Sequence, residues 1–270
     1  MKLWPLVAME NTLFSDSSLD WNARCATIGA AGFDGVYAVP YPLTDHDFPR
    51  LHHLAEAPQR HGLRLAGVYT NIDLALPPEH PTNALVSRLF AETEGAPTIE
   101  LSFKCSSPAA LPATPDGLDA AIAARLEPLL AIADRRGLKV ALYPHSFYPL
   151  ETPAHAAALV RRIAHSRLSY LFATSHVYAV SEPASVVAQL AACAGEISGI
   201  NLCGCRRIAP GPRAKCSHFP PDEGDLPITP LLAALAAGKY RGDLIVQGHG
   251  WSGNLASMLR RSVQCLCAEP

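Results

Sequence analysis

The sequence lacks a strong net charge, a long apolar run and a nucleotide-binding motif. Its 22 Lys and Arg residues nearly balance its 24 Asp and Glu residues, which gives a formal net charge of −2. Such a balance argues against a general nucleic-acid-binding or membrane-binding surface. No uninterrupted apolar run reaches the roughly 20 residues of a membrane-spanning helix. Neither the glycine-rich dinucleotide fingerprint nor a P-loop occurs. We therefore expect no nucleic-acid partner, no membrane partner and no nucleotide cofactor.

A secretory signal is also missing. The segment from Met1 to Ala8 is apolar, but Glu10 and Asn11 follow almost at once. This pattern is typical of a first strand rather than of a signal peptide. Eight Cys residues without a secretory signal indicate reduced thiols. The sequence therefore predicts a cytoplasmic protein, and it does not specify an oligomeric state.

What the chain does contain is an alternation of apolar runs and helical segments. Of its 270 residues 49% are hydrophobic, enough for a full core. Strands are predicted at 3–8, 32–39, 63–69, 98–103, 138–143, 168–172, 197–202 and 244–246. Helices are predicted at about 15–31, 45–61, 83–94, 116–136, 152–165, 183–194, 229–236 and 255–265. These eight units predict an α/β protein with a single (β/α)₈ TIM barrel over residues 1–270, whereas an open doubly wound sheet is disfavoured by the strand count.

Four successive strands deliver polar or metal-binding side chains at their C-terminal ends. The segments concerned end in His145, His176, Cys203-Gly-Cys205 and Gln247-Gly-His249. Active sites of parallel barrels lie at this end. We therefore expect side chains from strands 5 to 8 to surround one cavity, namely His145, His176, Asn201 and Gln247, with His249 on the rim. The long, Pro- and Gly-rich connection from 204 to 227 should cover the cavity and bring His218 over its opening.

Several of these motifs occur together in a known superfamily. They are Ala30-Ala-Gly-Phe-Asp-Gly-Val36, Arg136-Gly-Leu-Lys-Val-Ala-Leu142, Ala173-Thr-Ser-His176, the segment from His218 to Pro227 and the segment from Gly238 to Val246. In their order and spacing the chain resembles the xylose isomerase-like TIM-barrel superfamily. That superfamily includes sugar isomerases, sugar epimerases and endonuclease IV-type enzymes. The resemblance spans most of the chain.

The resemblance also implies a divalent metal, held by carboxylates from strands 5, 6 and 8 and a His from strand 7. The matching positions here are Tyr143, Ala173, Asn201 and Gln247. Hard cations such as Mg²⁺ and Mn²⁺ prefer anionic oxygen ligands, which these four residues do not offer. We therefore expect the usual metal site to be absent.

Two alternatives to that site remain open. Cys216, His218 and His176 are candidate ligands for Zn²⁺ with an open fourth position. In the alternative interpretation the same residues are an exposed thiol and two pocket histidines that hydrogen-bond a polyol. The pairs Cys203-Gly-Cys205 and Cys265-Leu-Cys267 are spaced too closely for typical zinc motifs. We interpret them as small buried or half-buried residues, with a nucleophilic role left open for the first pair.

Two classes of function fit these residues. The first is an isomerase, epimerase or lyase that moves a proton beside the carbonyl of a sugar-like compound. His145 or His176 is the candidate base, and Glu10 is a second candidate. A basic loop segment (Arg206, Arg207, Arg213 and Lys215) could hold a substrate anion. Candidate substrate contacts are Tyr143, Asn201, Arg206, Gln247, His249 and Trp251, joined by aromatic side chains at the strand ends.

The second class is a non-catalytic barrel that binds a sugar-like ligand or a protein partner, and a nuclease ranks third because bridging carboxylates are missing. If the histidines have ordinary pKa values, binding or turnover should change over about pH 5.5 to 7.5.

Overall fold

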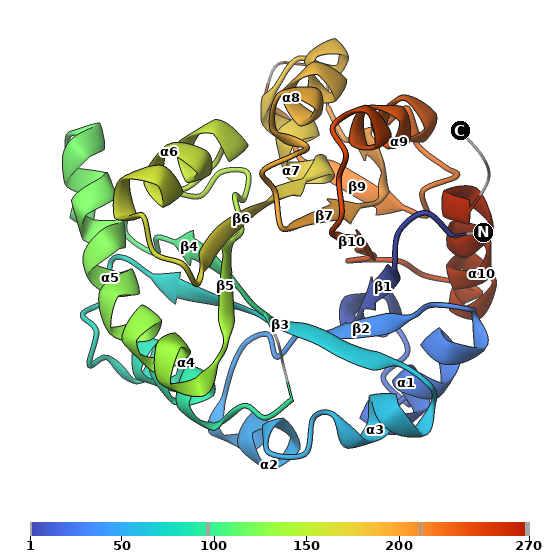
Figure 1. The fold of residues 1–270 in the computed structure, drawn as a ribbon, viewed down its shortest axis with the longest axis horizontal. Coiled ribbons are helices and arrows are strands. Elements are labelled where there is room, and N and C mark those ends of the chain that lie inside the picture. Colours follow the sequence, from blue (N-terminus) through green and yellow to red (C-terminus); the bar gives the residue numbers. More distant parts are fainter. Residues whose placement is uncertain (1, 96–97, 210, 212, 268–270) are drawn as a thin grey trace.

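The computed structural model describes residues 2–95, 98–209, 211 and 213–267. Eight parallel strands close into a barrel in the order β1-β10-β7-β6-β5-β4-β3-β2, and helices surround it (Figure 1). The predicted (β/α)₈ barrel is therefore confirmed. The ends of the predicted domain, residue 1 and residues 268–270, lie outside the described residues. No helix in the described ranges is both long enough and apolar enough to cross a membrane.

The barrel strands are short and mostly buried on both faces, as expected for a parallel sheet covered by helices. Their bounds are β1 Leu6–Met9, β2 Gly35–Ala38, β3 Arg64–Asp73, β4 Thr98–Lys104, β5 Lys139–Leu142, β6 Leu168–Ala173, β7 Gly199–Leu202 and β10 Asp243–Val246. Strand β3 extends beyond its predicted end because Thr70 to Asp73 continue to pair with β4. The residues added there, Thr-Asn-Ile-Asp, include two β-branched side chains that favour a strand.

The helices follow the predicted order with different bounds. They are α1 Trp21–Ala30, α2 Phe48–Leu51, α3 Glu56–Arg60, α4 Pro81–Glu92, α5 Pro115–Arg136, α6 Pro153–Ile163, α7 Thr174–Val180, α8 Val186–Cys193, α9 Ile228–Ala237 and α10 Leu255–Cys267. Helix α1 begins later than predicted because Asp20 caps it, accepting a hydrogen bond from the Ala23 amide. The predicted helix at 45–61 divides into a 3₁₀ turn, α2 and α3, since Pro58 has no amide to continue the helical hydrogen bonds.

Two differences lie at the C-terminal end of the barrel. Helix α7 begins directly after β6, so His176 lies in a buried first turn rather than in a loop. The connection after β7 contains an antiparallel hairpin of β8 (Gly204–Arg207) and β9 (Cys216–Phe219). Its base is tightly packed, because a Cβ on Gly204 would lie 1.8 Å from the Glu223 carbonyl oxygen. Pro210 and Pro212 of this connection lie outside the described residues.

Candidate active site

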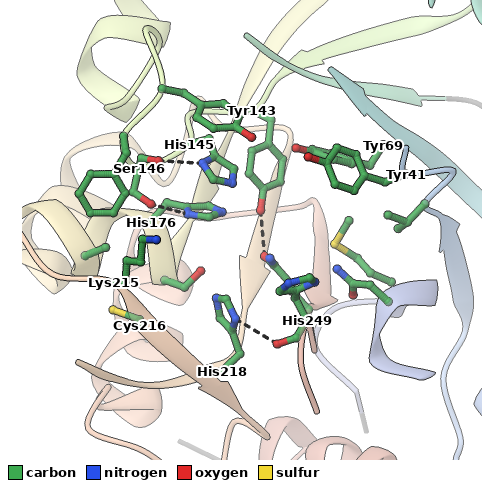
Figure 2. A pocket seen from close by; sticks show the side chains of 18 of the residues that line it. Tyr41, Tyr69, Tyr143, His145, Ser146, His176, Lys215, Cys216, His218 and His249 are labelled. Carbon is green, nitrogen blue, oxygen red and sulfur yellow. Dashed lines mark hydrogen bonds between the residues drawn. The ribbon is translucent and has the colours of Figure 1, made fainter. Parts of the chain in front are cut away.

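A cavity of about 480 Å³ opens at the C-terminal ends of the strands (Figure 2). Hairpin β8–β9 forms one wall of it through Cys216 and His218. The lining also contains six aromatic side chains: Phe14, Tyr41, Tyr69, Tyr143, Phe147 and Tyr148. Four imidazoles join them, from His145, His176, His218 and His249. Among the described lining residues there is no carboxylate, and Lys215 is the single Lys or Arg. The cavity is thus aromatic, rich in imidazoles and free of acidic groups within that lining.

His145 and His176 form the centre of the site. Their ring centroids lie 3.8 Å apart, and His145 also stacks on Tyr148 at 4.0 Å. Ser146 contacts both rings, since its Oγ is 3.0 Å from His176 Nδ1 and its carbonyl oxygen is 2.9 Å from His145 Nδ1. Figure 2 shows His218 and His249 on the opposite side of the cavity. The sequence-based expectation that strands 5 and 6 bring their histidines together is therefore met in the geometry.

Backbone carbonyls select the tautomer of two of these rings. A carbonyl oxygen only accepts hydrogen bonds, so His145 Nδ1 must donate to the Ser146 carbonyl. His218 Nδ1 must likewise donate to the His249 carbonyl, at 3.2 Å. In a neutral imidazole the other nitrogen then carries the lone pair. His145 and His218 each present a proton-accepting Nε2, whereas His176 Nε2 is buried without a hydrogen-bond partner among the described residues.

Burial keeps these imidazoles neutral. It lowers the pKa of His145 to about 4 and the pKa of His176 well below the ordinary value of 6.5. The pKa of His218 is lowered by the same cause. Loss of water around the ring disfavours the charged form, and the neighbouring imidazoles add to that effect. The expectation of ordinary titration between about pH 5.5 and 7.5 is therefore wrong for these three side chains.

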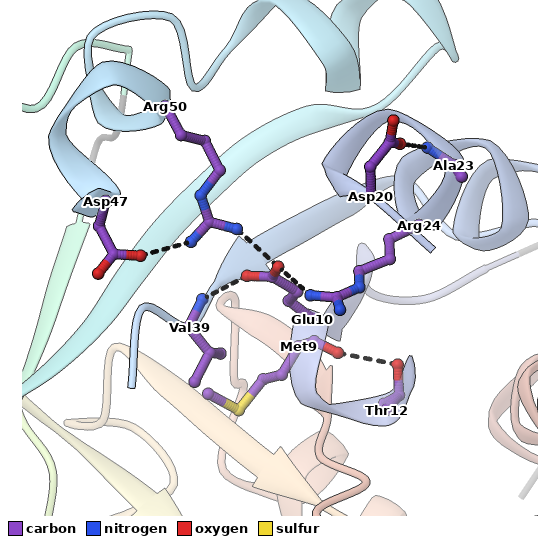
Figure 3. Close-up of polar contacts among 9 residues, drawn as sticks. All are labelled: Met9, Glu10, Thr12, Asp20, Ala23, Arg24, Val39, Asp47 and Arg50. Atoms are coloured by element: carbon purple, nitrogen blue, oxygen red, sulfur yellow. Dashed lines mark hydrogen bonds and ion pairs between the residues drawn. The ribbon is translucent and has the colours of Figure 1, made fainter. Parts of the chain in front are cut away.

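Glu10, the second candidate base, does not line the cavity (Figure 3). Its Oε1 lies 2.6 Å from Arg24 Nη1 and 2.7 Å from Arg50 Nη1, and its Oε2 accepts the Val39 amide at 2.9 Å. The carboxylate is buried, so all of its strong hydrogen-bonding positions face protein groups. This arrangement joins strand ends to helices and leaves no open position for a substrate proton.

Three further predicted contacts also lie away from the cavity. Arg206 is exposed, pairs with Asp225 at 3.5 Å and lies over the Phe219 ring. Trp251 is buried against the Gly248 backbone. Asn201 is buried in the barrel interior. Tyr143, Gln247 and His249 do line the cavity, as predicted contacts should.

The structure adds contacts that the sequence reasoning did not single out. Ser146 directly follows His145, and a small polar residue next to a strand-end histidine was the available signal. Tyr41 follows the end of β2 and lines the cavity with half of its surface exposed. Of the four cations in the basic loop segment only Lys215 reaches the cavity. Arg207 instead donates to carbonyls of the α7 end, and Arg213 pairs with Glu151.

Residues 23–268 match the family model described as xylose isomerase-like TIM barrel. The chain belongs to this family. No curated protein sequence matches it.

Solved structures of the xylose isomerase-like barrel include two epimerases. The 3-keto-D-glucoside 4-epimerase of E. coli is 19% identical with a TM-score of 0.69, over 91% of this chain and 93% of that one. The D-psicose 3-epimerase of Clostridium cellulolyticum H10, solved with D-tagatose, is 16% identical with a TM-score of 0.70, over 98% and 96%. A Mycobacterium smegmatis family member in complex with magnesium is 14% identical with a TM-score of 0.68, over 98% and 97%. At these identities the likeness establishes the shared fold.

This family member has a different donor set at the four positions where the resemblance places metal ligands. The Tyr143 hydroxyl donates to Gln247 Oε1 at 2.8 Å, and Asn201 Nδ2 donates to Glu100 Oε2 at 3.4 Å. Ala173 offers no donor. Burial raises the pKa of Glu100, which the sequence reasoning overlooked within strand 4, to about 8. These groups are neutral at pH 7 and largely bond one another, so they do not fit a hard divalent cation.

The zinc alternative is not supported by the geometry either. Cys216 and His218 lie two residues apart on β9 and both line the cavity, with His176 across from them. Among the described residues, no three His, Cys, Asp or Glu side chains lie close enough to hold a metal ion. Burial also raises the pKa of the Cys216 thiol to about 11, which disfavours the thiolate that zinc binds. The predicted trio is therefore not assembled as a ligand set.

Proposed function

We propose that this protein is an isomerase or epimerase for a small polyhydroxylated carbonyl compound, and that it moves the proton with imidazoles rather than with a divalent metal. The observation that carries the proposal is the His145–Ser146–His176 arrangement in a cavity whose described lining has no carboxylate. The two epimerases of the same fold support the substrate class.

The proton-transfer step follows from the tautomers. His145 Nε2 accepts the proton from the carbon beside the substrate carbonyl, because its Nδ1 is already donating to the Ser146 carbonyl. The product of this step is an enediolate. The Lys215 ammonium and a proton on His176 Nε2 stabilise the negative oxygen when Ser146 donates its hydroxyl to His176 Nδ1.

The low pKa of His145 has two consequences for this step. It leaves the Nε2 lone pair available at neutral pH, but it makes the ring a weak base. An enediolate beside the ring raises the pKa of His145, because opposite charges favour the protonated imidazole. Proton transfer and charge formation therefore support each other within the cavity.

The remaining lining fits a sugar-like molecule. The aromatic walls, including Tyr69 and Tyr148, can pack on apolar C–H faces of a sugar. Asn11 and Gln247 supply amide groups, and Ser175 supplies a hydroxyl, for the sugar hydroxyls. The cavity volume of about 480 Å³ is within the range of small-ligand sites.

Deuterium exchange tests the proposal even while the product is unidentified. The protein is incubated in D₂O with a panel of ketoses and keto-acids, and NMR follows deuterium entry beside the carbonyl. We expect exchange with at least one compound and a loss of about 100-fold or more in His145→Ala and His176→Ala, as for a general acid–base group. His53→Ala, which changes a side chain 70% exposed outside the cavity, should exchange like the parent.

His218→Ala is the third cavity variant to be tested. Like His145, His218 donates through Nδ1 to a backbone carbonyl and so has a proton-accepting Nε2. If all three cavity variants matched the parent on every active compound, the mouth of the barrel would not be the site. The enzyme proposal would then be abandoned.

A second candidate function is binding without catalysis. It is favoured by the absence of a carboxylate base from the described lining and by the low pKa of His145. Under this alternative a compound of the panel binds, the His145→Ala variant binds it more weakly, and no deuterium enters it. Both results, exchange that is lost in the cavity variants and binding that is weakened in His145→Ala, would assign the ligand to the barrel mouth. We also propose a cytoplasmic location, which is supported by the eight free thiols.

A further inference from the structure

A second cavity, of about 460 Å³, lies at the opposite end of the barrel from the imidazoles. The residues around it belong to the starts of strands and to the segments just before them. Arg64 begins β3, Thr98 begins β4 and Lys139 begins β5. The connections before β7 and β10 complete it with residues 194–195, 197–198 and 239–243.

The charges around this cavity are unbalanced. Arg64 pairs with Asp243, the single carboxylate among the described lining residues. Lys139, Lys239 and Arg241 also line the cavity, and none of them forms an ion pair with a described Asp or Glu. Three exposed cations therefore surround one space whose single described carboxylate already pairs with Arg64. Their mutual repulsion is unfavourable unless an anion is bound or salt screens it.

The backbone at Lys239 adds a second observation. Its φ is 53°, in the left-handed region that costs a side chain more than it costs glycine. Gly238 precedes it, yet the residue with the unfavourable conformation is the lysine. This segment ends α9 and turns into β10, so the conformation holds Lys239 at the edge of the cavity. A cation is thus held at a cavity that Lys139 and Arg241 also line, each without an ion pair to a described carboxylate.

We propose that this cavity binds a small multivalent oxyanion of the polyphosphate class. A monovalent anion would leave two of the three unpaired charges without a partner. Phosphoryl oxygens suit both the ammonium groups of Lys139 and Lys239 and the guanidinium of Arg241. The volume is sufficient for three phosphoryl groups.

The expected effect is on stability rather than on chemistry, because active sites of this fold lie at the other end. A bound anion would join the start of β5 to the segment before β10, which are separate parts of the sequence. A ligand that binds only the folded state raises the free energy of unfolding by mass action. This inference does not depend on the proposed enzymatic function.

Calorimetric titration of the full chain with inorganic tripolyphosphate at low ionic strength tests the proposal. We expect one site, binding weaker with orthophosphate, and binding reduced about tenfold in Lys139→Gln and in Lys239→Gln, as for loss of one charge-assisted hydrogen bond. Lys104→Gln makes the same charge change at the far end of β4 and should bind like the parent. Lys215→Gln should also bind like the parent, since Lys215 lines the other cavity.

Unfolding in urea without the anion separates a binding role from a structural one. Lys139→Gln and Lys239→Gln should be as stable as the parent or slightly more stable, because each removes repulsion. No binding of tripolyphosphate by the parent, or equal losses in all four variants, would overturn the proposal. Loss confined to Lys215→Gln would overturn it as well, by assigning the anion to the barrel mouth. A parallel titration with ATP distinguishes the source: equal affinity supports a nucleotide, and weaker affinity supports free polyphosphate.

Discussion

The ends of strands β1 and β5 lie at the same rim of the barrel, yet they use their polar residues in opposite ways. At the end of β1 the Glu10 carboxylate contacts two guanidiniums and a backbone amide and is closed to solvent. At the end of β5 the His145 ring is neutral, donates through Nδ1 and keeps Nε2 open toward a cavity. Under the proposed function, the Glu10 carboxylate serves the scaffold and the neutral His145 ring serves the site.

Two other buried carboxyl groups, Asp73 and Glu100, also lie outside the cavity at the barrel mouth. Asp73 Oδ1 accepts the amides of Ala75 and Ser106, at 3.0 and 3.1 Å, and so shapes the loops after β3 and β4. Glu100 is protonated at neutral pH because burial raises its pKa to about 8. Neither belongs to the lining of the cavity at the barrel mouth. A metal-dependent site of this fold would need such groups at the cavity, and here they lie elsewhere.

The largest predicted effect concerns the scaffold side of the comparison. Glu10→Gln should lower the free energy of unfolding by about 3 kcal/mol, because it removes the buried counter-charge of Arg24 and Arg50 and leaves Arg50 only its longer contact with Asp47, at 3.8 Å. Urea denaturation followed by circular dichroism measures this. Glu56→Gln is the control, since that carboxylate is 59% exposed and should contribute within about 0.5 kcal/mol.

Unchanged stability in Glu10→Gln together with lost deuterium exchange would reverse the comparison. Glu10 would then be the base that the sequence suggested.

The next effect is the contribution of the His145 ring to the pH dependence of the protein's stability. In the unfolded chain the imidazole takes up a proton near pH 6.5, whereas the folded protein resists it until about pH 4. The unfolded state therefore binds more protons in this window, and stability falls as the pH is lowered through it. Between about pH 7 and pH 4 the free energy of unfolding should therefore fall less in His145→Asn than in the parent, by a difference of the order of 2 kcal/mol.

Urea midpoints at both ends of that range give the measurement, and His53→Asn serves as the exposed control. Identical pH slopes for the parent and His145→Asn would show that burial does not hold this ring neutral.

The sequence predicted the barrel well because eight apolar runs alternate with eight helical segments along the chain. It also placed His145 and His176 at one rim, since parallel strands share that end. It could not assign Glu10, whose partners come from helices 14 and 40 residues away. Nor could it predict the lowered histidine pKa values. The pKa of His176, for example, is lowered by burial and by three neighbouring imidazoles, His145, His218 and His249, which come from separate segments.

The basic loop segment shows a similar limit. Arg206 and Lys215 are equally basic in sequence, but the hairpin places them differently. Arg206 lies opposite Ser217 in the hairpin register, on the face away from Cys216 and His218, which line the cavity. Lys215 directly precedes β9 and also lines the cavity. Without the hairpin register, nothing in the composition separates Lys215, which lines the cavity, from Arg206, which pairs with Asp225.

The smallest predicted effect sharpens this distinction. Lys215→Gln should weaken binding of active keto-acids about tenfold while changing binding of neutral ketoses less, as expected for one charge-assisted contact. Arg206→Gln, the matched control on the same hairpin, should leave both unchanged. Calorimetry with the compounds that respond in the exchange assay gives the comparison. Equal losses in both variants would indicate a general charge effect rather than a contact in the cavity.

Metal removal tests the central claim most directly. The protein is stripped with a chelator, its metal content is checked by elemental analysis, and deuterium exchange is repeated with the most active compound. We predict that the stripped protein exchanges at the rate of the untreated protein and that His176→Ala does not exchange. Loss of exchange on stripping, with recovery on addition of Mn²⁺ or Mg²⁺, would contradict an imidazole site that works without a divalent metal.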